Sequence, residues 1–169
     1  MDLNKIEEIK KHIKKVYSTY ARPFVVGFSG GKDSTATLQM VWETISEIPK
    51  KERTNDIYVI CTDTLVETPY IITYINDALE KISESAKLQN LPISVHKLTP
   101  LLEKSFWVNL IGKGYPAPSQ QFRWCTERLK ISPTTKYITD RISQHGEAVI
   151  LGINAYHPGA SAALVIDGV

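Results

Sequence analysis

A glycine-rich turn with a lysine and two serines follows an apolar run near the start of the chain. It reads Ser29-Gly30-Gly31-Lys32-Asp33-Ser34. Glycines let the backbone turn tightly and approach a ligand closely, and the N–H groups of such a loop and of a following helix start can bind an anion. The serine hydroxyls and the lysine ammonium add donors for phosphate oxygens. We therefore predict that these six residues bind the phosphates of a nucleotide, with Lys32 and Asp33 taking part in catalysis.

The spacing of the glycines excludes two common phosphate-binding patterns. The turn matches neither the Walker A sequence nor the dinucleotide-binding fingerprint. Its place, at the carboxyl end of the first expected strand, is still where open α/β sheets bind ligands. The alternative is a strand-to-helix turn that binds nothing.

A second polar cluster follows the next apolar run. Asp63 and Thr64 come directly after this run, and we expect both side chains to point into the same crevice as the glycine-rich turn. A carboxylate at this place can accept a hydrogen bond from adenosine or bind Mg²⁺, so Asp63 is also the candidate metal ligand. The alternative is a helix-capping cluster, because Thr68-Pro69 is a good helix start. Cys61 lies within the apolar run, where we expect a buried, unreactive thiol.

A third cluster places a cysteine among cations. Cys125 is surrounded by Arg123, Arg128 and Lys130. Nearby cations favour the thiolate, which is the nucleophilic form of cysteine, and the same cations can hold phosphate or sulfate oxygens. We predict that Cys125 is catalytic and that the three cations bind substrate phosphate. The alternative is a structural cysteine on a basic helix.

Length and composition limit the remaining possibilities. The 169 residues suffice for one domain. The net charge of +2 excludes a uniformly basic surface, but residues 104–145 carry seven bases and two acids, which suits an anionic substrate. No stretch approaches the ~18 apolar residues that cross a bilayer, and the N-terminus shows no secretory pattern. We therefore expect a cytoplasmic protein without membrane contact.

Apolar periodicity predicts alternating strands and helices. The expected strands are 24–28, 57–61, 93–98 and 148–151. The expected helices are 3–20, the segment from the glycine-rich turn to residue 46, 68–90, 100–111 and 133–144. This alternation is typical of βαβ units and predicts an α/β fold with a parallel sheet covered by helices.

Taken together, these residues resemble the DndC family of DNA phosphorothioation sulfurtransferases. The glycine-rich turn is similar to the PP-loop of N-type ATP pyrophosphatases, and DndC belongs to the PAPS-reductase-like branch of that superfamily. The resemblance covers about residues 1–151. The segments that carry it, besides the turn, are 61–69, 91–93, 96–100, 106–118 and 122–130. It implies a three-layer α/β sandwich of the adenine nucleotide alpha hydrolase type.

The resemblance also implies a reaction. DndC-like enzymes would split ATP into AMP and pyrophosphate with Mg²⁺, and so activate a non-bridging phosphate oxygen of DNA for replacement by sulfur. The implied partners are a cysteine desulfurase, other DNA phosphorothioation proteins and the DNA backbone, which binds basic surfaces without base contacts. Two alternatives stay open: a PAPS-reductase-like or other PP-loop enzyme that adenylates a small molecule, and a non-catalytic nucleotide-binding module.

The chain departs from this family in two places. Members of the family carry an iron–sulfur cluster on cysteines further along the chain, and the two cysteines present cannot hold one. After residue 151, the arginine and the Glu-Ser-x-x-Arg segment of the family are missing, and residues 152–169 resemble the opening strand-turn-strand of carbamoyltransferases. We therefore expect a C-terminally truncated PP-loop domain over 1–151 and an atypical tail over 152–169, with a terminal hairpin as the alternative to a chimeric origin.

Overall fold

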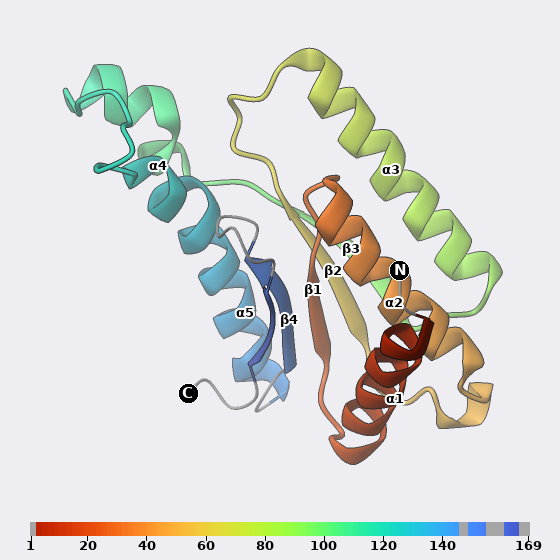
Figure 1. Cartoon of the computed structure of the whole chain (residues 1–169). Helices are drawn as coiled ribbons and strands as arrows, with labels where there is room; N and C mark the ends of the chain where they lie inside the picture. Colours follow the sequence, from red (N-terminus) through yellow and green to blue (C-terminus); the bar gives the residue numbers. More distant parts are fainter. Residues whose placement is uncertain (1–2, 146–148, 155–160, 166–169) are drawn as a thin grey trace.

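A mostly parallel sheet forms the centre of the computed structural model, which describes residues 3–145, 149–154 and 161–165. Its five strands lie in the order β3-β2-β1-β4-β5. They are β1 (Phe24–Gly27), β2 (Ile57–Thr62), β3 (Ile93–Leu98), β4 (Val149–Asn154) and β5 (Ser161–Val165). Neighbouring strands from β3 to β4 are parallel, and β5 runs antiparallel to β4 (Figure 1). The predicted fold class is confirmed.

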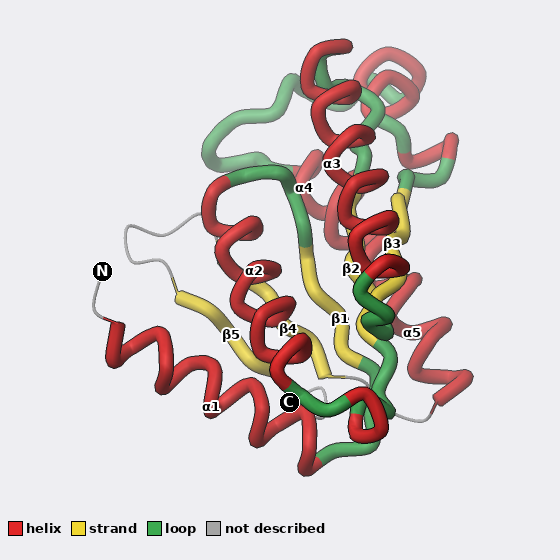
Figure 2. The backbone as a smooth tube through the Cα atoms, turned by 90° about the vertical axis from the view of Figure 1, so that its right-hand side faces the viewer, coloured by secondary structure: helices red, strands yellow, loops and turns green. Residues whose placement is uncertain are grey.

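Helices cover both faces of the sheet and complete three layers. The long helices are α1 (Leu3–Thr19), α2 (Lys32–Glu47), α3 (Pro69–Leu88) and α5 (Ser132–His145). α1, α2 and α3 lie on one face and α5 lies on the other (Figures 1 and 2). The predicted helices over 3–20, 68–90 and 133–144 are confirmed apart from one or two residues at their ends. None of the described helices is long and apolar enough to cross a membrane.

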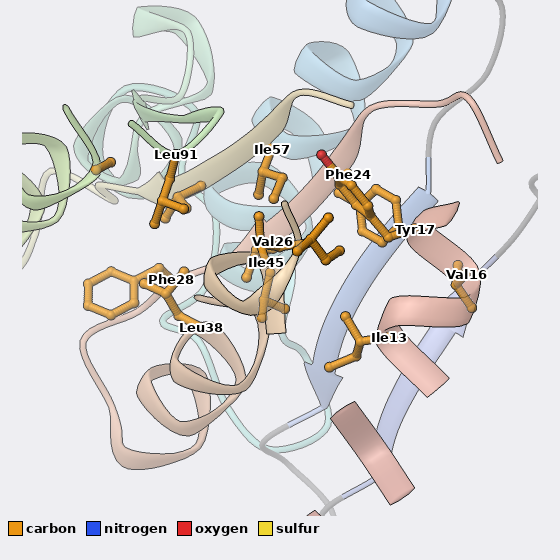
Figure 3. Close-up of a cluster of buried hydrophobic side chains, with 14 of the residues drawn as sticks. Ile13, Val16, Tyr17, Phe24, Val26, Phe28, Leu38, Ile45, Ile57 and Leu91 are labelled. Atoms are coloured by element: carbon orange, nitrogen blue, oxygen red, sulfur yellow. The ribbon is translucent and has the colours of Figure 1, made fainter. Parts of the chain in front are cut away.

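The larger apolar core lies between the sheet and α1, α2 and α3 (Figure 3). Val26 of β1, Val41 of α2 and Val59 of β2 are 0% exposed, which marks the centre of this core. β1 and β2 read as nearly continuous apolar runs because both of their faces are covered. Tyr17 of α1 lies at one end of this core, where its hydroxyl donates to the Asn55 backbone carbonyl at 2.9 Å. This packing holds β1 and β2 side by side and so sets the positions of the loops at their carboxyl ends.

A smaller core lies on the opposite face, under α5. Val25, Tyr58 and Ile60 of the sheet pack here against Tyr137 and Ile138 of α5. The Tyr58 and Tyr137 rings meet edge to face, with their centroids 6.3 Å apart. This contact docks α5, and with it the residues just before α5, against the sheet.

A helical cap, defined here as residues 101–131, joins β3 to α5 and lies beyond the N-terminal end of α5 (Figure 1). The prediction of a single helix over 100–111 is wrong. The chain forms a 3₁₀ turn, η2 (Leu102–Lys104), and a π-helical turn, η3 (Val108–Gly112), with an extended Ser105 between them. The cap ends in α4 (Trp124–Thr126) and η4 (Glu127–Ile131), which lead directly into α5.

Aromatic packing explains why this apolar segment does not form one helix. Phe106 stacks on Trp124 with ring centroids 5.4 Å apart, and Tyr115 meets Trp124 edge to face at 5.6 Å. The Trp124 indole N–H donates to the Pro116 carbonyl at 2.9 Å. The apolar side chains of the cap thus serve a small local core, and this tertiary packing overrides the helical spacing in the sequence.

The C-terminal strands extend the sheet beyond the predicted fourth strand. β4 continues to Asn154, three residues past the expected end at 151, and β5 pairs with it from Ser161 to Val165. Residues 155–160 and 166–169 of the predicted tail lie outside the described residues. The division of the chain at residue 151, and the origin of the tail, stay predictions.

Candidate functional site

A pocket of about 540 Å³ opens at the carboxyl ends of β1 and β2. The glycine-rich turn forms one wall, and the residues that follow β2 form another. Ile71, Ile72 and Ile75 of α3 add an apolar side. Lys97 of β3 and Lys130 of the cap also line the pocket. An apolar side beside converging polar groups is typical of small-molecule sites.

Hydrogen bonds of its own two serines fix the shape of the glycine-rich turn beside this pocket. The Ser34 hydroxyl accepts from the Ser29 N–H at 3.2 Å and lies 3.1 Å from the Ser29 hydroxyl. The same hydroxyl donates to the Gly31 carbonyl at 3.0 Å. Helix α2 begins at Lys32 with Gly31 as its N-cap, and no side chain caps this helix start. The first N–H groups of α2 are therefore available to an anion in the pocket.

Five of the six predicted phosphate-binding residues line the pocket. They are Ser29, Gly31, Lys32, Asp33 and Ser34. Within the described part of the chain, the Lys32 ammonium has no hydrogen-bond or ion-pair partner, so its charge is available for a phosphate oxygen. Gly30 serves the turn differently, because its φ of +74° is a conformation that side chains rarely adopt and its Cα faces the Tyr74 ring of α3.

Asp63 lies in the pocket but is already engaged. One carboxylate oxygen forms an ion pair with the Lys97 ammonium at 2.8 Å, and the other accepts from the Leu65 N–H at 2.9 Å. Burial, the largest single influence, raises the pKa of Asp63, but Lys97 and the Leu65 N–H together hold this pKa below its ordinary value. Asp63 is therefore an ionised carboxylate at neutral pH, and Lys97 is fixed beside it in the pocket.

The Asp63→Asn variant is expected to lose about 1–2 kcal/mol of unfolding free energy at pH 7, because it removes a charge-assisted hydrogen bond. Since the pKa of Asp63 is lowered in the folded state, its contribution is present above the unfolded pKa of about 3.9 and is lost as the pH falls through the folded value. Urea unfolding at pH 7 and pH 3 measures this difference, which should shrink at pH 3. The control is Asp140→Asn, in an exposed pair with Lys136 at 3.2 Å, where a loss below about 0.5 kcal/mol is expected. Equal losses for both variants would contradict the prediction.

Thr64 and Cys61, which lie close to Asp63 in the sequence, are both buried. Thr64 is buried, donates to a Glu67 carboxylate oxygen at 3.0 Å and does not line the pocket, so its predicted role in nucleotide binding stays a prediction. Its hydroxyl instead positions Glu67, which does line the pocket. Cys61 is buried, and burial raises the pKa of its thiol, which the Lys97 ammonium opposes only in part. The predicted burial of Cys61 is confirmed, although the residue also contributes to the pocket lining; its lack of reactivity stays a prediction.

The residues of the cysteine cluster are brought to three different places. Lys130 lines the main pocket, and Arg128 donates to the Tyr115 hydroxyl at 2.7 Å and lines a second pocket beside it. Arg123 donates to the Gln120 carbonyl at 3.2 Å and lines neither pocket. Cys125 is half-buried in the cap and is also absent from both linings. Its catalytic role stays a prediction.

Besides Glu67, Lys97 is a charged pocket residue that was not predicted from the sequence. It lies at the next-to-last position of β3, in register with Cys61 of β2. Its ammonium forms an ion pair with Asp63 and donates to the side-chain amide oxygen (Oδ1) of Asn76 in α3 at 3.1 Å. A charged residue at the carboxyl end of a predicted parallel strand is a usable signal, because that edge of the sheet is where ligands bind.

The carboxylates of the pocket fit a magnesium ion that arrives with a nucleotide. Asp33, Asp63 and Glu67 line the pocket, and Mg²⁺ usually takes one or two protein carboxylates together with substrate phosphates. The described residues hold no group of three or more side chains placed to bind a metal ion without a substrate. The two cysteines do not fit an iron–sulfur cluster, because Cys61 is buried in the sheet and Cys125 lies in the cap.

These features define a class. A glycine-rich turn that lines a pocket at the carboxyl edge of a three-layer α/β sheet and leads directly into a helix is the arrangement of a PP-loop domain. Residues 23–165 match the family described as phosphoadenosine phosphosulfate reductase domain, and the chain belongs to this family. The superfamily and the PAPS-reductase-like character are thereby confirmed, and the narrower DndC assignment stays a prediction.

A curated relative matches a large part of the chain. The sequence is 28% identical over 128 residues to "Uncharacterized protein MJ0066" of Methanocaldococcus jannaschii. The match covers 76% of this chain and 22% of that protein. The chain thus spans about a fifth of the length of this relative.

Proposed function

We propose that this protein is an ATP pyrophosphatase that adenylates an oxygen of its substrate. The observation that carries the proposal is the main pocket, where an uncapped helix start, Lys32 and the serines of the glycine-rich turn face Asp63 and Lys97. The turn supplies N–H and hydroxyl donors for the terminal phosphates of ATP. The apolar side formed by α3 is suited to a base and ribose.

The chemistry follows from this placement of charge. An acceptor oxygen would attack the α-phosphorus of ATP, a new P–O bond would form, and the bond to the bridging oxygen would break with its electron pair leaving on pyrophosphate. Donors that stabilise the charge developing on pyrophosphate lower the barrier. Lys32 and the N–H groups at the start of α2 are placed for this role, and Mg²⁺ brought with ATP would neutralise further charge.

We further propose that the acceptor is a phosphate oxygen of DNA. The support is the charge and surface of the cap region: residues 104–145 carry seven bases and two acids, and Trp107 and Phe122 are 56% and 45% exposed. Cations bind the DNA backbone, and exposed aromatic rings can stack on bases. A cysteine desulfurase would supply sulfur as a persulfide. Attack of its terminal sulfur on the activated phosphorus would form a P–S bond and release AMP. A second thiol would then cleave the S–S bond, so that the sulfur stays on phosphorus and the two thiol sulfurs end as a disulfide.

A second candidate is supported by the family match. Because residues 23–165 belong to the phosphoadenosine phosphosulfate reductase domain family, a small sulfur- or phosphate-bearing molecule is the alternative acceptor. A non-catalytic nucleotide-binding module in the cytoplasm is the remaining alternative.

Product analysis after incubation with ATP and Mg²⁺ tests the proposal. We expect AMP and pyrophosphate in equal amounts, with release stimulated by DNA together with a sulfur donor. Release of ADP and phosphate would contradict the pyrophosphatase assignment. Stimulation by a small sulfate or phosphate ester and not by DNA would favour the second candidate, and ATP binding without any product would favour the non-catalytic module.

The Cys125→Ser variant is expected to abolish sulfur transfer to the acceptor while ATP binding stays within about twofold of the native value. The reason is that Cys125 does not line the ATP pocket and can carry or receive sulfur only as a thiolate. Sulfur incorporation measured by mass spectrometry, alongside nucleotide binding, checks both halves. Cys61→Ser is the control for loss of a thiol and is expected to retain transfer because Cys61 is buried; since Cys61 also lines the main pocket, its ATP affinity is measured alongside. Persistent transfer in Cys125→Ser would make Cys125 structural.

A further inference from the structure

A second pocket, of about 350 Å³, lies beside the main one on the α5 side of the sheet. The end of β3, the start of the cap and the first turns of α5 form its walls. Thr99 and Leu101 line it from the segment after β3, and Ser132, Pro133 and Tyr137 line it from α5. No residue of the glycine-rich turn lines this second pocket, so the second pocket is a site separate from the main pocket.

Cations dominate the lining of this second pocket. Lys97, Lys104, Arg128 and Lys136 face a single carboxylate, that of Asp140. The cations come from three different parts of the fold, β3, the cap and α5, which only the folded chain brings together. Such a convergence of positive charge in a concave site attracts anions, because it raises their local concentration.

Two of these cations have neutral partners. The Lys104 ammonium donates to the Ser132 hydroxyl at 3.2 Å, and Arg128 donates to the Tyr115 hydroxyl at 2.7 Å. Within the described residues, neither cation has a carboxylate in ion-pair distance. Their hydroxyl partners hold the side chains in place without cancelling the charge. The guanidinium of Arg128 also lies over the Tyr115 ring, 5.0 Å from its centroid, which further fixes it.

Lys97 connects the second pocket to the first. It lines both pockets, and its ammonium is fixed by Asp63 at 2.8 Å on the side of the main pocket. A ligand in the second pocket and a nucleotide in the first would therefore both lie beside Lys97, the residue that the two linings share. Adjacent sites for two reactants are what a reaction between them requires.

We propose that the second pocket binds a phosphate group of the acceptor, the molecule whose oxygen is adenylated. This inference rests on the proposed function for the role of the ligand, but the anion site itself rests on the lining cations. Lys104, Arg128 and Lys136 hold the phosphate, and Lys97 lies between it and ATP. Arg128 is thus the one predicted substrate-binding cation that belongs to this pocket, and Lys97, Lys104 and Lys136 are new assignments.

Phosphate titration followed by NMR tests the site directly. Inorganic phosphate is added to the full chain in the presence of saturating α,β-methylene-ATP, which occupies the main pocket and is not cleaved there. We expect saturable shifts of the backbone amides of Thr99, Leu101 and Ser132. Lys136→Gln should raise the phosphate Kd about three- to fivefold, as expected for loss of one partly exposed charge. Lys87→Gln, on an exposed lysine in the last turn of α3, is the matched control and should leave the Kd unchanged.

A variant that is expected to strengthen phosphate binding distinguishes loss of a phosphate contact from damage to the fold. Asp140 pairs with Lys136 at 3.2 Å and is the one acid in the lining. Asp140→Asn should therefore lower the phosphate Kd about two- to fivefold, a gain that damage to the fold cannot produce. The absence of shifts at the three amides, or equal Kd values for Lys136→Gln, Asp140→Asn and Lys87→Gln, would overturn the inference.

The same assay separates this inference from the proposed function. AMP release without phosphate binding at the second pocket would refute the inference alone. Phosphate binding without AMP release would refute the proposed function and leave the anion site standing. Competition then identifies the source of the phosphate group: displacement by a short DNA oligonucleotide supports a DNA diester, and displacement by a mononucleotide alone supports a small molecule.

Discussion

The Lys32→Ala variant is expected to bind ATP at least about tenfold more weakly than the native chain while keeping its stability. Lys32 lines the main pocket, is exposed, and within the described residues has no partner that would compete with a phosphate. Loss of one charge-assisted hydrogen bond of about 1.5–3 kcal/mol corresponds to about a 10- to 100-fold weaker complex. Alanine is also favourable within α2, so the fold should not suffer.

Calorimetric titration with α,β-methylene-ATP measures this affinity, and a thermal melt without nucleotide measures stability. Lys87→Ala is the matched control, because it removes an exposed lysine from the far end of another helix. Its affinity should equal that of the native chain. If Lys32→Ala also binds with native affinity, the glycine-rich turn is not the phosphate site, and the proposed function loses the observation that carries it.

The position of the glycine-rich turn could be predicted because the signal is local. An apolar run, two glycines, a lysine and a helical pattern all occur between Phe24 and Glu47, and each is recognised without knowledge of the rest of the chain. The order of strands and helices was predictable for the same reason, since both faces of the central strands are covered and their sequences are apolar throughout.

Lys97 and Lys104 were not predicted because their roles depend on long-range packing. Lys97 reaches Asp63 only through the register that pairs Cys61 with Lys97. Lys104 reaches the second pocket only because Tyr137 docks α5 on Tyr58 and so places Ser132 within 3.2 Å of its ammonium. Neither the register of a parallel pair nor the docking of a helix can be deduced from the spacing of residues along one segment.

The cap shows a related failure. Its apolar residues over 100–111 have helical spacing, but the stacking of Phe106 on Trp124 joins two segments that are separated in the sequence. That contact favours two short helical turns, η2 and η3, over one continuous helix. The cluster of cations around Cys125 was likewise treated as one group, whereas the helical path from Trp124 to Ile131 turns Arg128 and Lys130 toward different pockets.

The Gly30→Ala variant is expected to lose about 1–3 kcal/mol of unfolding free energy and to bind ATP more weakly. At Gly30 the φ of +74° costs a side-chain-bearing residue about 1–2 kcal/mol. The added Cβ would also lie 3.2 Å from the Tyr74 ring, so that either the turn or α3 must shift. Because Ser29 and Gly31 on either side line the main pocket, any shift of the turn would displace the proposed phosphate donors. Urea unfolding and calorimetric titration measure the two effects.

Two further glycines separate the causes. Gly114 has a similar φ of +66° but nothing within 4 Å of an added Cβ, so Gly114→Ala should show the conformational cost alone and leave ATP binding unchanged. Gly31→Ala adds a Cβ at an ordinary φ of −79°, 3.5 Å from the Ser29 hydroxyl, and should cost little stability. In the double variant Gly30→Ala with Tyr74→Ala, removal of the ring should recover the contact part of the loss and not the conformational part. Native stability in Gly30→Ala would show that the turn accepts a side chain. If Gly30→Ala loses only as much unfolding free energy as Gly114→Ala and keeps native ATP affinity, the contact with α3 does not position the phosphate donors.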